Sequence, residues 1–173
     1  MFDVYFDHIK LSENHHVHDF LTVRPKVSLG DNLIVGICVL PQYKDSFALM
    51  KGWRHQFNEE IWQAPAGFAE PKEDPSVTAL RELREETSLT CSSDDLVLLG
   101  SFIPDAGLVQ GRVALYLAMN CVSTSDKVSY EIGMGKLHYF SKDQLMELIC
   151  QTSNIGGSTV TTCMRALNYL SRL

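Results

Sequence analysis

Apolar and polar positions along the chain alternate in blocks that predict strands separated by short turns. A β-branched apolar run over residues 32–41 ends at a proline, which is typical of a buried strand. A short polar link follows, and residues 46–53 then predict the second strand of a hairpin. Five further segments have strand patterns: residues 20–25, 61–67, 96–104, 111–120 and 136–140.

Three segments have helical patterns. Asp74 can cap free amide groups and Pro75 is tolerated at a first helical position, so we expect a helix that begins there and ends near Thr87. Residues 141–150 and 158–173 predict two closing helices. In the second, apolar residues recur at helical spacing: Val160, Cys163, Met164, Leu167 and Leu170. Mixed strands with few helices predict a layered α/β or α+β domain.

Length and composition indicate one globular domain. A chain of 173 residues suits one domain, and a domain of this size buries roughly 70% of the surface that its unfolded chain exposes. Apolar residues make up 45% and charged residues 21%, near the averages of globular proteins, which excludes a disordered or fibrous class. We interpret residues 1–173 as a single domain in which residues 1–30 form an N-terminal strand extension.

The charge balance narrows the classes of partner. A formal net charge of −6 argues against a general nucleic-acid binder, whose phosphate contacts need a basic face, although a metal ion can still hold a small anionic substrate. The first twenty residues mix Asp, His, Lys and Glu and do not resemble a signal peptide, and no apolar run approaches the length of a membrane span. We therefore expect a cytoplasmic protein that binds neither nucleic acid nor a membrane.

Cysteine and histidine positions are less informative. The five cysteines have no Cys-x-x-Cys pair and their odd number excludes a fully paired disulfide framework, so reduced, packed thiols are expected. These are Cys38, Cys91, Cys121, Cys150 and Cys163. The histidines His15, His16 and His18 lack a carboxylate at clear ligand spacing, so we interpret them as a solvated segment rather than a metal site.

An acidic stretch over residues 67–89 introduces the candidate chemistry. It holds six carboxylates against three basic residues: Glu70, Glu73, Asp74, Glu82, Glu85 and Glu86 against Lys72, Arg81 and Arg84. Each helical residue advances about 100°, so Glu82, Glu85 and Glu86 fall within an arc of roughly 100° on one face. Such carboxylates suit Mg²⁺ or Mn²⁺, and a bound cation would reverse their mutual repulsion. Taken alone, the cluster is more typical of a solvated surface helix than of a metal site.

The spacing of the whole stretch is more specific. Gly67 is followed by five residues and Glu73, then by seven residues and RELREE over residues 81–86, with Leu89 three residues further on. This arrangement resembles the box of the Nudix family, which reads Gly, x5, Glu, x7, Arg-Glu-aliphatic-x-Glu-Glu-x-Gly-aliphatic. A chance match is on the order of one in a million. The departure is Ser88, where the family has a glycine just beyond the helix; Ser costs about 1 kcal/mol in the same left-handed conformation.

The resemblance implies a divalent-metal site that takes Mg²⁺ or Mn²⁺. Its implied ligands are the carboxylates of Glu82, Glu85 and Glu86 and the carbonyl of Ala66. Gly67 would form the motif turn, and Glu73 and Arg81 would pair and brace the loop against the helix. Glu131, in a glycine-containing segment after the box, is the best candidate for the catalytic base, with a solvated loop glutamate as the alternative.

The surroundings of the box are similar to one branch of the family. Residues 47–70 are similar to the segment of Nudix ADP-ribose pyrophosphatases and related nucleotide-sugar hydrolases in which an aromatic-Arg pair and a Trp-x-x-Pro-x-Gly turn precede the box. Pro104, fifteen residues beyond Leu89, lies near the proline that marks this branch. The resemblance covers roughly residues 23–149 and implies an α/β/α sandwich with a mixed sheet, in a homodimer formed through N-terminal strands.

Three substrate contacts follow as candidates. The face of Trp53 suits stacking on a base, and the forked guanidinium of Arg54 suits a phosphate or ribose. A packed core position is the alternative for Trp53. Arg112, in the strand after Pro104, is a weaker candidate.

Three interpretations of function are open. The first is a Mg²⁺-dependent Nudix hydrolase that cleaves the pyrophosphate of ADP-ribose or a related nucleoside diphosphate sugar to a nucleoside monophosphate and a sugar phosphate. The second is a Nudix-fold module that senses such a nucleotide without cleaving it, which the complete set of acidic motif residues disfavours. The third is a structural domain with a charged helix, which does not account for the spacing.

Overall fold

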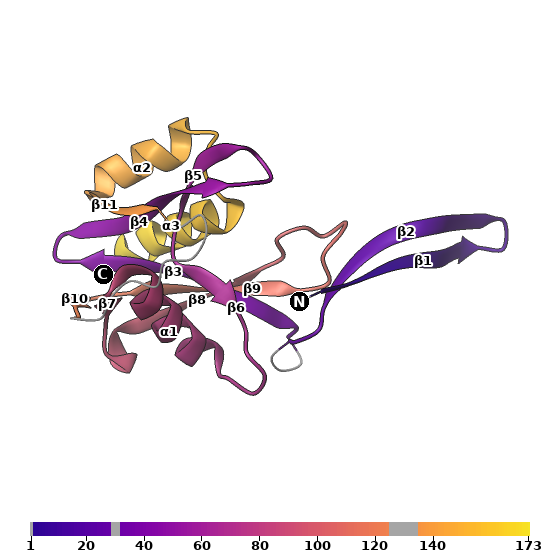
Figure 1. Ribbon diagram of the computed structural model, residues 1–173, viewed down its shortest axis with the longest axis horizontal. Helices are drawn as coiled ribbons and strands as arrows, with labels where there is room; N and C mark the ends of the chain where they lie inside the picture. The colour runs from indigo at the N-terminus through magenta and orange to yellow at the C-terminus, as the bar shows by residue number, and fades with distance from the viewer. Residues whose placement is uncertain (1, 29–31, 125–134) are drawn as a thin grey trace.

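A mixed β-sheet forms the centre of the molecule. The computed structural model describes residues 2–28, 32–124 and 135–173. The strands of the sheet run in the order β11-β4-β3-β9-β8, with β5 added to β4 and β6 added to β3 (Figure 1). Their bounds are β3 (Ile34–Tyr43), β4 (Ser46–Arg54), β5 (Glu59–Gln63), β6 (Ala66–Phe68), β8 (Leu96–Phe102), β9 (Arg112–Ala118) and β11 (Lys136–Phe140). Among the strand pairings of this sheet that the structure describes, only that of β3 with β9 is parallel.

Strand β3 has apolar side chains on both faces, which explains its continuous apolar run. Successive side chains of a strand point to opposite faces. Cys38 and Leu40 belong to one core cluster, and Ile37 and Val39 to the other. The prediction of a buried strand over residues 32–41 is confirmed, because each of these four side chains is at most 2% exposed.

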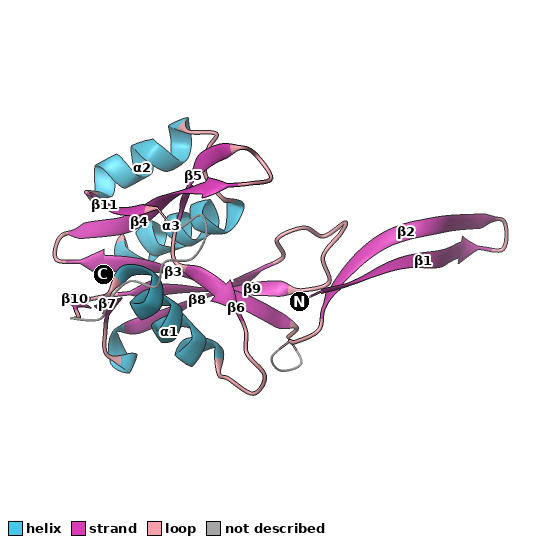
Figure 2. Ribbon diagram, viewed as in Figure 1, coloured by secondary structure: helices cyan, strands magenta, loops and turns pink. Residues whose placement is uncertain are grey.

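Helices cover both faces of the sheet (Figure 2). Helix α1 (Pro75–Thr87) packs Ala79 and Leu83 against the cluster of Ile37 and Val39. Helices α2 (Lys142–Gln151) and α3 (Gly157–Leu170) pack against the opposite cluster, where Leu145 and Cys163 are fully buried. The predicted layered domain with a mixed sheet is therefore confirmed. Within the described residues, no helix combines the length and the apolar character that crossing a membrane requires.

An antiparallel hairpin of β1 (Phe2–Ser12) and β2 (His15–Pro25) projects away from the sheet (Figure 1). The base of the hairpin is tied to the domain by two hydrogen bonds: the amide of Val23 donates to the carbonyl of Leu108 at 2.8 Å, and the amide of Gln110 donates to that of Val23 at 2.9 Å. The strand pattern predicted over residues 20–25 is only the end of β2. The structure therefore extends that prediction to two full strands.

Three small elements have no counterpart in the predicted pattern. Strand β7 (Leu89–Thr90) pairs antiparallel with β10 (Val122–Ser123), and the 3₁₀ helix η1 (Ser93–Asp95) links β7 to β8. Strands of two residues are too short to produce a periodic pattern, so sequence periodicity cannot detect them.

Both ends of α1 have the local structure that the sequence predicted. The carboxylate of Asp74 accepts a hydrogen bond from the amide of Ser76 at 2.8 Å, and Pro75 opens the helix. At the other end Ser88 has φ 54° and ψ 25°, in the left-handed region, and its amide donates to the carbonyl of Arg84 at 2.9 Å. Ser88 thus adopts the conformation in which a side chain is unfavourable and glycine is not.

We predict that the helix end is more stable with glycine than with alanine at position 88. Ser88→Gly and Ser88→Ala both remove the hydroxyl and differ only in the Cβ atom, which is strained at this φ. The glycine variant should be more stable by about 1 kcal/mol, or about 2–4 °C in Tm. Thermal unfolding of both variants checks this, and equal melting temperatures would show that the cap is unstrained.

Candidate functional site

Arg81 lies among four carboxylates on and beside α1. Its Nε and Nη2 atoms donate to the two oxygens of Glu73 at 3.3 and 3.2 Å. Its Nη1 atom donates to Glu82 Oε1 at 2.7 Å and to Glu85 Oε2 at 3.3 Å. Glu70 adds a longer ion pair of 3.9 Å. The guanidinium therefore offsets the repulsion among carboxylates that three- and four-residue spacing brings together.

The ion pair of Arg81 with Glu73 joins the loop before α1 to the helix. Hydrogen bonding to Arg81 is the main reason that the pKa of Glu73 lies below its ordinary value, and a 2.8 Å hydrogen bond from the hydroxyl of Thr78 acts in the same direction. The pKa of Arg81 is raised, chiefly by its hydrogen bond to Glu73. Both groups are thus held in their charged forms. The pairing that the resemblance implied is present.

Strand β6 passes directly over the glutamates of α1. The amide of Ala66 donates to Glu86 Oε2 at 2.9 Å. Gly67 lies so close to Glu82 that a Cβ atom at position 67 would overlap its carboxylate. On the other side, a Cβ at Gly36 would lie 2.7 Å from the carbonyl oxygen of Gly67. Strand β6 therefore fits between β3 and α1 only because both positions are glycine.

The donor set of this site suits a hard divalent cation. Glu82, Glu85, Glu86 and the backbone of Ala66 bring oxygen atoms to one end of β6, and Mg²⁺ and Mn²⁺ prefer oxygen ligands. As they stand, no three His, Cys, Asp or Glu side chains in the described part of the chain are arranged to hold a metal ion. Glu82 and Glu85 are directed at Arg81, and Glu86 at the amide of Ala66, so metal binding requires these carboxylates to turn about their side-chain bonds.

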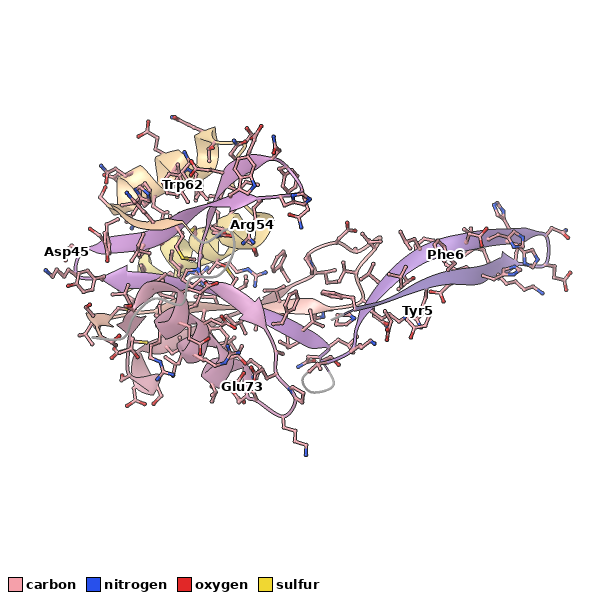
Figure 3. The ribbon with its side chains drawn as sticks, viewed as in Figure 1. Tyr5, Phe6, Asp45, Arg54, Trp62 and Glu73 are labelled. Carbon is pink, nitrogen blue, oxygen red and sulfur yellow. The ribbon has the colours of Figure 1, made fainter. Side chains whose placement is uncertain are left out.

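The three predicted substrate contacts lie on other elements. Trp53 and Arg54 are at the end of β4, and Arg112 begins β9. Trp53 is 46% exposed, which excludes the core position that the sequence left open. The guanidinium of Arg54 hydrogen-bonds to the side chain of Gln63, and Figure 3 shows Arg54 by the β4–β5 hairpin, apart from Glu73 beside α1.

Of the two remaining candidates, the structure describes Arg112 but not Glu131. Arg112 borders a cavity of about 220 Å³ that Ile103 and Gln110 also line. Glu131, the candidate base, lies outside the described residues.

Sequence reasoning missed two contributors to the network around Arg81: Glu70, to which it gave no role, and the fully buried Thr78. The position of Thr78, three residues before Arg81 on the same helix, was the available signal for it.

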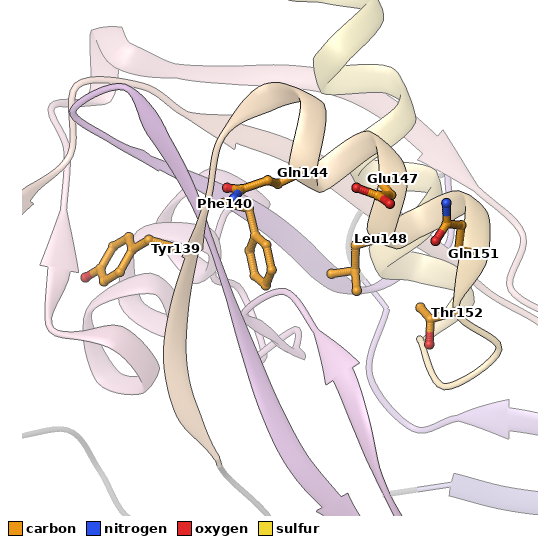
Figure 4. A pocket seen from close by; sticks show the side chains of 7 residues that line it. All are labelled: Tyr139, Phe140, Gln144, Glu147, Leu148, Gln151 and Thr152. Atoms are coloured by element: carbon orange, nitrogen blue, oxygen red, sulfur yellow. The ribbon is translucent and has the colours of Figure 1, made fainter.

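A second hollow lies between β11 and α2, on the face of the sheet opposite to α1 (Figure 4). Its volume is about 550 Å³, and Tyr139, Phe140 and Leu148 provide apolar lining while Gln144 provides an amide. The amide oxygen of Gln144 already accepts from the backbone of Ser141 in a helix cap. This hollow is therefore separated from the acidic site by the sheet.

The histidines of the hairpin form a cluster that includes a residue the sequence did not single out. His8 on β1 lies 3.1 Å from His16 on β2, measured from Nε2 to Nδ1, and its ring centroid is 4.1 Å from that of His18. All three are exposed. They are not among any metal-holding group of the described chain.

The comparison with protein families decides the assignment. A family model described as NUDIX domain matches residues 32–133, which is more than half of the 173-residue chain. The chain belongs to the Nudix family. The matched span includes β3, β6 and all of α1, so the acidic network around Arg81 is the Nudix box of this chain.

Two relatives are similar to parts of the chain. The methanol dehydrogenase activator of Bacillus methanolicus is 35% identical over 75 residues, which are 43% of this chain and 40% of that protein. The ADP-ribose pyrophosphatase of Mycobacterium tuberculosis is 30% identical over 95 residues, 54% of this chain and 41% of that protein. The chain therefore spans about two fifths of the length of either relative.

The fold is shared with a solved structure over nearly the whole chain. A crystal structure of ADP compounds hydrolase superposes with a TM-score of 0.83 at 15% identity, covering 99% of this chain and 88% of that one. At this identity the likeness shows the fold alone. The predicted Nudix sandwich is confirmed by it.

We predict a pH-dependent contribution of Glu73 to stability. Because its pKa is lowered in the folded protein, Glu73 stabilises the fold above its unfolded pKa, and this contribution is lost as the pH falls through the lowered value. Glu73→Gln should therefore cost about 1–2 kcal/mol near neutral pH and progressively less below about pH 4. Urea unfolding at several pH values, with a chelator present, measures the difference.

Glu70→Gln is the matched control for this prediction. The Glu70 side chain is 65% exposed and lies 3.9 Å from Arg81, so its removal should change the free energy of unfolding by less than about 1 kcal/mol. A difference for Glu73→Gln that stays constant across the pH range would show that the charge of Glu73 does not brace the loop.

Proposed function

We propose that this chain hydrolyses the pyrophosphate bond of ADP-ribose or a related nucleoside diphosphate sugar, giving a nucleoside monophosphate and a sugar phosphate. The observation that carries the proposal is the position of Glu82, Glu85 and Glu86 on one face of α1, directly beneath the backbone of β6. The ADP-ribose pyrophosphatase among the relatives supports the choice of substrate class.

Some site residues would bind the metal ion, and others hold the helix and the loop in place. Glu82, Glu85, Glu86 and the carbonyl of Ala66 would hold Mg²⁺ or Mn²⁺, which supplies positive charge to the nonbridging phosphate oxygens and acidifies an attacking water. Arg81 holds the helix and loop in register through Glu73, and its hydrogen bonds to Glu82 and Glu85 are those that these carboxylates would give up to hold a metal ion. The bracing pair with Glu73 does not depend on that exchange.

The substrate would be held by residues at the end of β4 and the start of β9. Trp53, with its exposed ring, stacks on the base, and Arg54 and Arg112 bind phosphate or ribose oxygens through their forked donors. Glu131 accepts the proton of the attacking water as general base. These roles deepen the proposal and each can be tested by substitution.

A binding module that senses the nucleotide without cleaving it is the second candidate. It is favoured by one observation, namely that the guanidinium of Arg81 holds Glu82 and Glu85 through hydrogen bonds that need no metal ion.

The proposal predicts turnover of a nucleoside diphosphate sugar in the presence of Mg²⁺. The protein is incubated with ADP-ribose, ADP-glucose, UDP-glucose, NADH, diadenosine polyphosphates and deoxynucleoside triphosphates, and the released monophosphate is measured. We expect hydrolysis of ADP-ribose or a nucleotide sugar. Glu86→Gln should lower the rate at least ~100-fold, because it removes a ligand while its amide oxygen can still accept from Ala66.

The control is Glu147→Gln, the same chemical change on α2, across the sheet from the acidic site. It should leave the rate unchanged, and the melting temperature of both variants shows that they are folded. Near-wild-type activity of Glu86→Gln would refute the ligand assignment. No turnover of any compound, together with tight binding of one without metal, would establish the sensor instead.

We further propose that the chain forms a homodimer through its hairpin. On one face of the hairpin, Val4 and Phe6 are 60% and 68% exposed, and Leu21 pairs with Phe6. The other face carries Tyr5 and the ion pair of Asp7 with Arg24 at 2.9 Å. Figure 3 shows Tyr5 and Phe6 on opposite sides of the ribbon. An isolated two-stranded hairpin is marginally stable in water, so we expect its apolar face to pack against a partner surface.

Phe6→Glu should convert a dimer to a monomer, since it places a charge at the centre of the apolar face. Light scattering of the wild-type chain and of the variant, at equal concentration, gives the masses. Tyr5→Glu, one residue away on the polar face, should leave the dimer intact. A monomeric wild-type chain, or dissociation by Tyr5→Glu alone, would contradict this interface.

A further inference from the structure

The short sheet of β7 and β10 places two cysteines opposite each other. Thr90 pairs with Val122 and Leu89 with Ser123. The same antiparallel register, continued by one residue, brings Cys91 opposite Cys121. Facing residues of antiparallel strands have Cα atoms about 4.5–5.5 Å apart, which lies inside the range of about 4.4–6.8 Å that disulfides require.

Side-chain contacts agree with this pairing. The thiols of Cys91 and Cys121 lie close enough to shift each other's pKa. Both residues belong to the core cluster that contains Leu89. Cys121 is buried, with its thiol 3.3 Å from the carbonyl oxygen of Ala118, whereas Cys91 is partly exposed. One sulfur is therefore reachable from solvent, and the other lies directly behind it.

We propose that Cys91 and Cys121 are a redox-active pair that a peroxide converts to a reversible intramolecular disulfide. The Cys91 thiolate attacks one oxygen of the peroxide, the O–O bond breaks, and Cys91 becomes a sulfenic acid while water or an alcohol leaves. The sulfur of Cys121 then attacks the Cys91 sulfur. The S–S bond forms, the S–O bond breaks, and water leaves with the proton of Cys121. The two thiols lose two electrons and the peroxide gains them.

The acidities of the two thiols match this order of events. The hydrogen bond from Cys121 is the main cause that lowers the pKa of Cys91, so Cys91 is the sulfur that ionises first. The same interaction and burial raise the pKa of Cys121. A partly exposed thiol of lowered pKa next to a second thiol is the arrangement that favours disulfide formation over further oxidation.

The other cysteines provide internal comparisons. Cys38 and Cys163 are fully buried in the opposite core cluster, where a peroxide has no access. Cys150 is exposed on α2 and has the sulfur of Met146 at 3.8 Å as its thiol contact. Cys150 therefore reports general thiol oxidation, and the pair reports the proposed reaction.

The bond would form at the end of the helix that carries the metal ligands. Strand β7 begins one residue after Ser88, the cap of α1. The amide of Thr124, which follows β10, donates to the carbonyl of Ser88 at 2.8 Å. A disulfide between residues 91 and 121 would add a covalent link beside this hydrogen bond, and closing a loop of that length restricts the unfolded chain.

A peptide map tests the proposal. The full-length protein is treated with hydrogen peroxide, free thiols are blocked, and trypsin is added without reductant. Cleavage after Arg84, Arg112 and Lys127 puts the two cysteines on separate peptides, 85–112 and 113–127. We expect these peptides to be joined with the loss of two hydrogen atoms, and to separate after dithiothreitol. The oxidised protein should also melt at least ~3 °C higher than the reduced protein.

Variants separate the pair from general oxidation. Cys150→Ser should form the linked peptide and show the same rise in melting temperature, whereas Cys121→Ser should show neither. The wild-type map does not depend on the folding of any variant. Oxidation of Cys91 to a sulfinic acid, or its linkage to Cys150 of a second molecule, without the joined 85–112 and 113–127 peptides would overturn the proposal.

Discussion

The guanidinium of Arg81 is the interaction on which the acidic site depends. Four carboxylates cannot lie close together in a partly buried place without a counter-charge, and Arg81 contacts all of them from the centre of α1. Its planar fork serves the loop through Glu73 and the helix through Glu82 and Glu85 at once, which a lysine's point charge would not do. The loop before α1 and the glutamate face are therefore one unit.

Steric fit holds this unit against the sheet. Two glycines remove side chains where β3, β6 and α1 meet, so that the β6 backbone comes within reach of Glu86. Gly67 belongs to the motif, but Gly36 lies thirty-one residues earlier and makes the same close approach possible from the other side. The geometry of the site is thus determined partly by a strand that contributes no ligand.

The sequence predicted the elements with strong local signals and missed those defined by distant contacts. Strand β3 and helix α1 have continuous apolar runs or explicit caps, so their bounds were foreseen within a few residues. Strand β1 alternates on an exposed ribbon that buries little, and β7 has two residues, so neither produces a usable period. In the site, the resemblance of the motif to the Nudix box implied the pair of Arg81 with Glu73. The contact of Glu70 and the exposure of Trp53 depend on the path of loops, which spacing does not encode.

Strand β3 has a consequence for how the molecule opens. It is hydrogen-bonded to β4, β6 and β9 and buried on both faces, so its amides should exchange with solvent only through global unfolding. Because β6 pairs with β3 and α1 packs on it, the acidic site shares that most protected part of the chain. The projecting hairpin is expected to be the least protected part, because it packs little and opens locally. The acidic site and the hairpin would then respond to temperature independently of each other.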